Sequence, residues 1–328
     1  MISVHFYNRL KATWYPSRFQ GWGRQKSYFE GWYYKLVNRH QTAVLAVIPG
    51  VAYAPKEDHA FIQVIDGTNR QSSYHVFPIE SFSAAKNEMR VQIDANIFSD
   101  QGIHLQLPNL KGSLQFSHQV PWPRSISRPG VMGWYSFMPF MQCYHGLVSM
   151  DHNLRGSLEL GDTLLDMDSG KGYIEKDWGS SFPRSWIWTQ CNHYQGQKLS
   201  VMASVAHIPW RNSFFIGFLA LIWTGQKLKI FTTYTDAQMK AEIGVETVTL
   251  AFQDRREKLE IRAIQAPGAV LKSPIDGEMK GKVNESMQAI HEVTYRRADG
   301  TRLIAQGTSA GLEVAGDVDE LLTDAWRK

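Results

Sequence analysis

Cysteine is almost absent from this sequence, since the 328 residues contain only Cys143 and Cys191. Two cysteines cannot build a disulfide scaffold or a zinc site made of thiolates. A strong excess of one charge is also missing, because 35 Lys and Arg stand against 31 Asp and Glu, which leaves a net charge of +4. The basic residues are scattered along the chain, so composition gives no electrostatic case for a nucleic-acid partner.

Long apolar runs are absent as well. The most apolar segment, Phe214–Trp223, is about half as long as the ~20 residues that a membrane-spanning helix needs. The first residues, Met1–Phe6, lack the basic start and the long apolar core of a signal peptide. We therefore expect a cytoplasmic protein. Peripheral membrane association and the oligomeric state stay open.

Motifs for nucleotides and metals are missing too. The sequence has no Walker A motif, no G-x-G-x-x-G that opens a helix and no H-E-x-x-H pair, so we expect neither a cofactor nor a metal. Gly307–Gly311 reads GTSAG, which fits the G-x-S-x-G motif of hydrolases. That motif needs a helix after the serine and a histidine downstream. Here a strand pattern continues and the last histidine is His291, so we expect a strand flanked by glycines.

Aromatic residues and short alternating segments are what the sequence has in abundance. Phe, Trp and Tyr make up 12% of the chain. Many short alternating runs, separated by Gly, Asn, Asp or Pro, are typical of β-sandwiches and β-barrels. The runs are 27–37, 43–53, 59–66, 88–94, 102–107, 186–193, 199–208, 214–223, 228–233, 245–252, 259–263, 285–296 and 302–313. They predict an all-β protein.

The breaks between the runs predict two domains. A turn cluster at 168–172 separates two series of strands, so we expect an N-terminal β domain at 1–170 and a C-terminal β domain at 171–328. Region 121–145, rich in Pro, Gly and aromatic residues, is expected to form a long ordered loop. A short helix is expected at the C-terminus, with capping residues and an apolar stripe. These residues are Asp317, Glu320, Leu321, Leu322 and Trp326.

The first segment that suggests chemistry is 27–35, which reads SYFEGWYYK. On a strand Tyr28, Glu30, Trp32 and Tyr34 point to the same side, because side chains alternate. A carboxylate among aromatic rings is costly unless it is paired, hydrogen-bonded or protonated. Glu30 is therefore either a functional acid or a hydrogen-bonded brace, and both alternatives stay open.

The second segment, 172–179, reads GYIEKDWG. Glu175 and Asp177 share one strand face with Tyr173. They are either acids of a functional site or partners in salt bridges with Lys176 or Arg184, and the sequence leaves both alternatives open.

The third segment, 182–192, reads FPRSWIWTQCN. Its strand places Trp186, Trp188, Gln190 and Asn192 on one face. Two indoles beside two amides form an apolar wall with hydrogen-bonding groups, which is how a small-molecule pocket is usually lined. This wall predicts a hydrophobic small-molecule ligand.

Together, these segments closely resemble the tocopherol cyclase family, which is itself similar to lipocalin-like carotenoid 1,2-hydratases and to Diels–Alderase-like proteins. Segment 132–152, MGWYSFMPFMQCYHGLVSMDH, looks like the connecting segment of bacterial members. The resemblance implies two lipocalin-like antiparallel β-barrel halves with a hydrophobic ligand site. One departure stands out, because the cyclases read more like EKNWGGGFP where this chain has EKDWGSSFP.

The resemblance also implies a reaction, the acid-catalysed closure of a ring on a prenylquinol-type isoprenoid. An alkene is a poor base, so the acid should be a carboxylic acid held protonated in a dry site. Among the carboxylates Glu175 is the first candidate, Glu30 the second, and Asp177 the third because the cyclases tend to carry Asn at its position. The expected ligand-binding residues are Trp32, Tyr34, His145, Trp178, Trp186, Trp188, Gln190 and Asn192.

Other functions fit the same residues. Water could capture the cation, which would make the protein a hydratase, or an aromatic pocket could fold a polyene for a pericyclic reaction. A non-catalytic binder or carrier of an isoprenoid or quinone is the non-enzymatic alternative. Arg or Lys partners on all three carboxylates would favour the binder.

Overall fold

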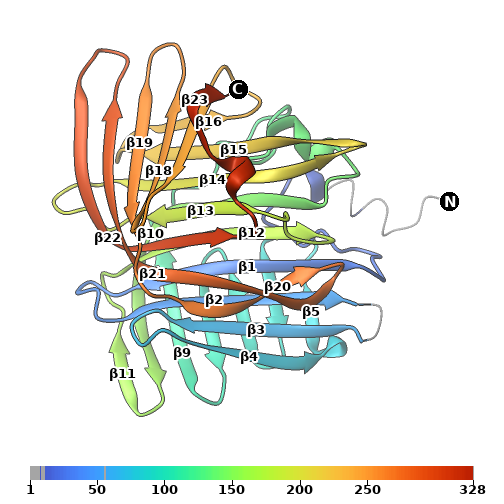
Figure 1. Cartoon of the computed structure of the whole chain (residues 1–328). Helices are drawn as coiled ribbons and strands as arrows, with labels where there is room; N and C mark the ends of the chain where they lie inside the picture. Colours follow the sequence, from blue (N-terminus) through green and yellow to red (C-terminus); the bar gives the residue numbers. More distant parts are fainter. Residues whose placement is uncertain (1–7, 9–11, 55–56, 328) are drawn as a thin grey trace. The chain divides into compact units, whose positions relative to one another are not determined.

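The computed structural model describes residues 8, 12–54 and 57–327 and consists almost entirely of β-strands (Figure 1). Strands account for 61% of the residues and helical turns for 4%. Contacts divide the chain into two units: Met1–Phe182 with Leu271–Lys282, and Pro183–Val270 with Val283–Lys328. No helix in the described part of the chain is long and apolar enough to cross a membrane. The expectation of a cytoplasmic protein rested partly on residues 1–6, and these lie outside the described residues.

The first sheet has 12 strands in the order β4-β3-β2-β1-β12-β10-β9-β8-β7-β6-β5, with β11 paired to β10. Its neighbouring strands pair in antiparallel register. Two 3-10 turns, η1 (Ile79–Ser81) and η2 (Gly133–Phe137), accompany it. The strands are β1 (Tyr28–Val37), β2 (Val44–Tyr53), β3 (His59–Asp66), β4 (Gln71–Pro78), β5 (Phe82–Ala84), β6 (Arg90–Ile93), β7 (Asn96–Ser99), β8 (Gly102–Gln106), β9 (Leu110–Ser117), β10 (Cys143–Leu160), β11 (Thr163–Asp166) and β12 (Lys171–Gly179).

The second sheet has 11 strands in the order β16-β15-β14-β13-β22-β21-β19-β18-β17-β23, with β20 paired to β21. One 3-10 turn, η3 (Asp319–Leu321), precedes its last strand. The strands are β13 (Trp186–Cys191), β14 (Ser200–Trp210), β15 (Ser213–Trp223), β16 (Leu228–Thr232), β17 (Gln238–Ile243), β18 (Thr247–Gln253), β19 (Lys258–Ile264), β20 (Ala269–Ile275), β21 (Glu278–Arg296), β22 (Arg302–Ala315) and β23 (Thr323–Arg327).

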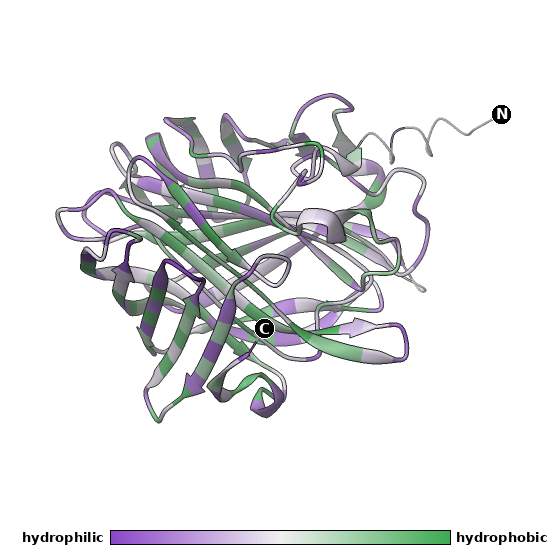
Figure 2. Cartoon of the chain, turned by 90° about the horizontal axis from the view of Figure 1, so that it is seen from above, coloured by the Kyte–Doolittle hydropathy of each residue, from purple (hydrophilic) through white to green (hydrophobic). Residues whose placement is uncertain are grey.

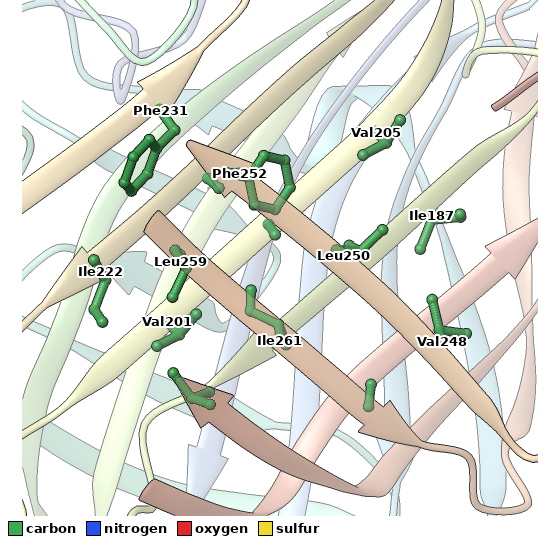
Figure 3. Packing of buried hydrophobic residues seen from close by; sticks show 14 of the residues in the cluster. Ile187, Val201, Val205, Ile222, Phe231, Val248, Leu250, Phe252, Leu259 and Ile261 are labelled. Carbon is green, nitrogen blue, oxygen red and sulfur yellow. The ribbon is translucent and has the colours of Figure 1, made fainter. Parts of the chain in front are cut away.

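Each sheet surrounds a hydrophobic core of its own. Alternating residues of β1, such as Trp32, Tyr34 and Leu36, contribute to the core of the first unit. In the second unit residues such as Ile187 and Phe252 pack together from several strands (Figure 3). Hydrophilic and hydrophobic residues alternate along several strands in Figure 2, because one face of each strand packs inward.

The prediction of an all-β fold with two antiparallel sheets is confirmed. Contacts divide the chain after Phe182 rather than at residue 170, because β12 pairs with both β1 and β10. Loop 118–142 contains no strand and holds η2, in agreement with the expected long loop. The tip of the β20–β21 hairpin belongs to the first unit, where the Gln63 side chain accepts a hydrogen bond from the Lys272 N–H at 2.8 Å.

The prediction of a C-terminal helix is wrong. Only the single turn η3 forms, and the chain then extends as β23 beside β17. Asp317 accepts a bond from the Asp319 N–H at 3.3 Å, as a capping residue would, but the turn does not continue. A short helix is marginal by itself. A strand that satisfies its backbone groups against β17, with Leu321 fully buried beside it, is the better solution.

Gly31 and Gly50 face each other across β1 and β2 and provide a test of this packing. A Cβ on Gly50 would lie 2.6 Å from the backbone oxygen of Glu30 and 2.4 Å from the Phe61 ring, whereas one on Gly31 would have its nearest neighbour at 3.6 Å. Gly50→Ala should therefore lower the free energy of unfolding by about 1–3 kcal/mol, and Gly31→Ala by less than about 1 kcal/mol. Denaturant titrations of both variants measure this difference, and equal losses would contradict the packing described.

Candidate active site

Strand β12 organises the polar groups of the first unit because it lies between β1 and β10. In its register Trp178 opposes Glu30 and Lys176 opposes Trp32 on β1, while Asp177 opposes His145 on β10. Side chains alternate along a strand, so successive residues of β12 point to opposite faces. Lys176 and Trp178 share the face of the core residue Ile174, and Glu175 and Asp177 share the other.

On the core side, Glu30 and Lys176 form a buried ion pair. Both side chains are fully buried, and the Lys176 Nζ lies 2.6 Å from the Glu30 Oε1. The Tyr28 hydroxyl donates to the Glu30 Oε2 at 2.5 Å, and the Gln20 N–H donates to the same carboxylate at 2.9 Å. The Lys176 ammonium also donates to the carbonyl of Pro16 at 2.9 Å.

Burial decides the titration of this pair. It raises the pKa of Glu30 and lowers the pKa of Lys176 to about 8, against the mutual attraction of the two charges. The many hydrogen bonds compensate the lost hydration, as a buried ion pair requires. Glu30 thus has the geometry of the brace that the sequence left open, and its role as an acid stays a prediction.

The predicted aromatic ligand-binding residues of the first unit lie on the same side. Trp32 is fully buried, and its indole N–H donates to the carbonyl of Ser17 at 2.9 Å. Tyr34 is also fully buried and donates to the carbonyl of Ser99 at 3.1 Å. The Trp178 ring stacks on Tyr144 at 5.4 Å between centroids. These rings pack in or beside the core, so their contact with a ligand stays a prediction.

On the other face of β12, three titratable side chains meet. The His145 Nδ1 lies 2.9 Å from the Asp177 Oδ1, and its Nε2 lies 3.5 Å from the Glu175 Oε2. The Tyr173 hydroxyl donates to the Glu175 Oε2 at 2.5 Å. The side chain of Glu175 is 6% exposed, that of His145 14% and that of Asp177 25%. The three side chains therefore lie close to the surface, and Glu175 is the most completely covered of them.

This arrangement holds a proton at neutral pH. Burial by itself would lower the pKa of His145, but the charges of Asp177 and Glu175 and the hydrogen bond to Asp177 outweigh it and raise the pKa to about 9. At pH 7 the His145 ring is therefore protonated, beside the carboxyl groups of Asp177 and Glu175. When ionisable groups interact as closely as this, an apparent pKa belongs to the set of groups rather than to one residue.

A cation could occupy the same three side chains. One ligand atom from each of His145, Glu175 and Asp177 lies within 4.8 Å of the others. Imidazole and carboxylate groups are donors that divalent transition metals accept. The sequence suggested no metal, and that expectation stays a prediction.

The wall expected on β13 lies in the second unit. Ile187 and Cys191 belong to its core, so Trp186, Trp188 and Gln190 point to the opposite face. Trp188 is 6% exposed, and Gln190 and the following Asn192 are almost completely buried. The wall is thus a buried polar and aromatic face that the core does not use.

Sequence reasoning missed the acids beside this wall. The Trp186 indole N–H donates to the Glu313 Oε2 at 2.6 Å, and Glu313 opposes the buried Glu285 across β22 and β21. Their only sequence signal is their place in alternating strands, which many surface glutamates share.

The GTSAG segment, Gly307–Gly311, lies within strand β22, as the sequence predicted. A Cβ on Gly311 would lie 2.7 Å from the Trp188 ring, so this position requires glycine.

The fold defines the class of the protein, an all-β protein built from two antiparallel sheets. CghA, solved with Sch210972, has a TM-score of 0.60 and 14% identity, with 88% of each chain covered. A putative AttH protein from Nitrosomonas europaea has a TM-score of 0.53 and 12% identity, with 88% of this chain and 92% of that chain covered. At these identities the likeness shows the fold alone.

A sequence model described as tocopherol cyclase-like matches residues 113–316, and the chain belongs to that family. A probable chloroplastic tocopherol cyclase from Oryza sativa subsp. japonica and a chloroplastic tocopherol cyclase from Zea mays are each 30% identical over 74 residues. Those residues are 23% of this chain and 16% of each plant protein. The resemblance noted in the sequence is confirmed at the level of the family.

The raised pKa of His145 predicts how stability depends on pH. Its pKa is 6.5 ordinarily and about 9 in the folded protein, so its stabilisation is complete below about pH 6.5 and is lost as the pH rises through 9. Lys176 acts in the opposite direction, but only above its pKa of about 8 in the folded protein. There the folded protein releases a proton that the unfolded chain keeps, so the contribution of Lys176 to stability rises with pH. Between about pH 6.5 and pH 8 the free energy of unfolding should therefore fall by up to about 1.4 kcal/mol per pH unit.

Urea titrations across that window, on the wild type and on His145→Gln, measure the slope. The variant removes the titrating group and keeps a polar side chain, so its stability should change less with pH than that of the wild type. Equal slopes in both proteins would show that His145 does not hold the proton.

Proposed function

We propose that this protein is an enzyme that binds a hydrophobic, prenylquinol-type isoprenoid and closes a ring on it by protonating an alkene. The observation that carries the proposal is the covered group of His145, Glu175 and Asp177, in a chain of the tocopherol cyclase-like family. A stored proton and low exposure are what alkene protonation needs, because a carbocation near water would be hydrated.

The proton begins on His145 and reaches the substrate through Glu175. When an apolar substrate covers the group and removes water, the neutral pair of imidazole and carboxylic acid is favoured over the ion pair. The Glu175 carboxylic acid then adds its proton to one alkene carbon and leaves a tertiary cation on the other. The phenol oxygen attacks this cation, a C–O bond forms, and the phenol proton returns to the Glu175 carboxylate. The group ends with the proton it began with.

Asp177 positions the histidine in this scheme. Its contact with the Nδ1 of His145 at 2.9 Å orients the ring so that the Nε2 faces Glu175. The cyclases tend to carry Asn at this position, and an Asn oxygen could accept the same hydrogen bond. An acid at 177 is therefore not needed for the transfer itself.

The partners of the carboxylates favour an enzyme over a carrier. A lysine neutralises Glu30 in the core, as expected of a brace, whereas Glu175 and Asp177 meet a titratable histidine. A carrier would gain nothing from a proton that can move. The choice among cyclase, hydratase and pericyclase depends on how water is excluded from the bound substrate and how the chain of the substrate is folded.

Glu175→Gln tests the proposed acid, with Glu30→Gln as the matched control on the same sheet. Gln keeps the size of Glu175 and removes its proton, so the conversion of a prenylated hydroquinone to its chromanol should fall by about 10²-fold or more, as loss of general acid catalysis normally does. Glu30→Gln leaves Lys176 buried without its counter-charge. It should lower the free energy of unfolding by about 3–5 kcal/mol and keep its turnover per folded molecule.

Product formation followed by chromatography, together with melting curves of both variants, separates the roles. Full turnover by Glu175→Gln would remove Glu175 from the mechanism. A wild type that binds prenylquinols but converts none of them would favour the carrier.

A further inference from the structure

One surface of the first unit exposes large apolar side chains. It consists of segment 12–27 and loop 118–142, and we call it the aromatic surface. The exposed fractions are large for such residues: Trp14 36%, Phe137 36%, Trp134 43%, Phe140 45% and Ile126 86%. Clustered exposure of this kind marks an interaction site, whereas single exposed apolar residues are ordinary.

The two segments form one continuous surface. The rings of Trp14 and Phe137 lie 5.3 Å apart between centroids. The guanidinium of Arg124 from the loop lies 4.7 Å from the Tyr15 ring, and that of Arg18 lies 3.8 Å from the same ring. The Trp14–Phe137 and Arg124–Tyr15 contacts join the two segments, and the Arg18–Tyr15 contact lies within the first.

The charges that the two segments contribute to the aromatic surface are all positive. Neither segment contains an Asp or a Glu, so all 31 acidic residues lie in the rest of the chain. The cations are Arg18, Arg24, Lys26, Arg124 and Arg128. Glu88, from outside the two segments, lies close enough to act on Arg18. Five cations with this one acid still leave a positive surface, which attracts an anionic partner.

We propose that the aromatic surface binds the surface of an anionic lipid bilayer. Trp and Tyr rings prefer the boundary between lipid and water, where one end of the side chain stays wet. Arg residues near an anionic leaflet add electrostatic attraction. Ile126 and Phe140 are exposed apolar side chains without hydrogen-bonding groups, which suits acyl chains better than nucleic-acid bases. The proposal is independent of the acid chemistry, since it concerns where the protein works.

Flotation of the full chain with lipid vesicles, without substrate, tests the proposal. Binding should be stronger to phosphatidylcholine mixed with phosphatidylglycerol than to phosphatidylcholine alone. It should weaken when salt rises from about 0.1 M to about 1 M, because the screening length falls from about 10 Å to about 3 Å. The double variant Arg124→Glu with Arg128→Glu should bind the anionic vesicles more than about tenfold less. Arg302→Glu, an exposed change in the second unit, is its control.

A second pair of variants tests the apolar part. Trp134→Ala with Phe140→Ala should lower vesicle binding about tenfold or more through the lost apolar contact. Phe214→Ala, which removes a ring that is 48% exposed in the second unit, should leave binding unchanged. No flotation of the wild type, equal losses in the controls, or displacement of the vesicles by a single-stranded RNA would each overturn the proposal.

Discussion

The alternation of side chains along one central strand organises the first unit of this protein. Strand β12 pairs with β1 on one side and β10 on the other, and its successive residues point to opposite faces of the sheet. Lys176 points into the core and meets Glu30, whereas Glu175 and Asp177 point the other way and meet His145. A shift of β12 by one residue would exchange the two sets and place unpaired charges in the core. The ion pair in the core therefore fixes the register in which the acidic group is assembled.

The two polar groups differ in what a proton can do. Glu30 and Lys176 are surrounded by hydrogen bonds from Tyr28 and Gln20 and to backbone carbonyls, so movement of a proton would break several contacts at once. His145 lies 2.9 Å from Asp177 and 3.5 Å from Glu175, and Glu175 in turn accepts a hydrogen bond from the Tyr173 hydroxyl. The first group has the geometry of a structural brace, and the second is the group to which we assign the proposed proton transfer.

Much of the fold could be predicted from the sequence because strand formation is local. The run 59–66 matches β3 in full, and 43–53 matches β2 within one residue. The pairing of strands is not local, so the contact of Glu30 with Lys176, 146 positions later, could not be read from alternation. The contact of Glu175 with His145 could not be predicted for the same reason, although each of the two residues was a candidate on the basis of its own sequence segment. The C-terminus was misjudged because the capping residues produce only the single turn η3, after which the chain pairs with β17, and that pairing cannot be read from local spacing.

The central claim is that His145 keeps a proton at neutral pH because Asp177 and Glu175 surround it. The titration of His145 by NMR in the wild type and in Asp177→Asn tests this most directly. The account predicts a pKa of about 9 in the wild type and a value closer to the ordinary 6.5 in the variant, where one of the two charges is gone. A wild-type pKa at or below 6.5, or one that the variant leaves unchanged, would contradict the account.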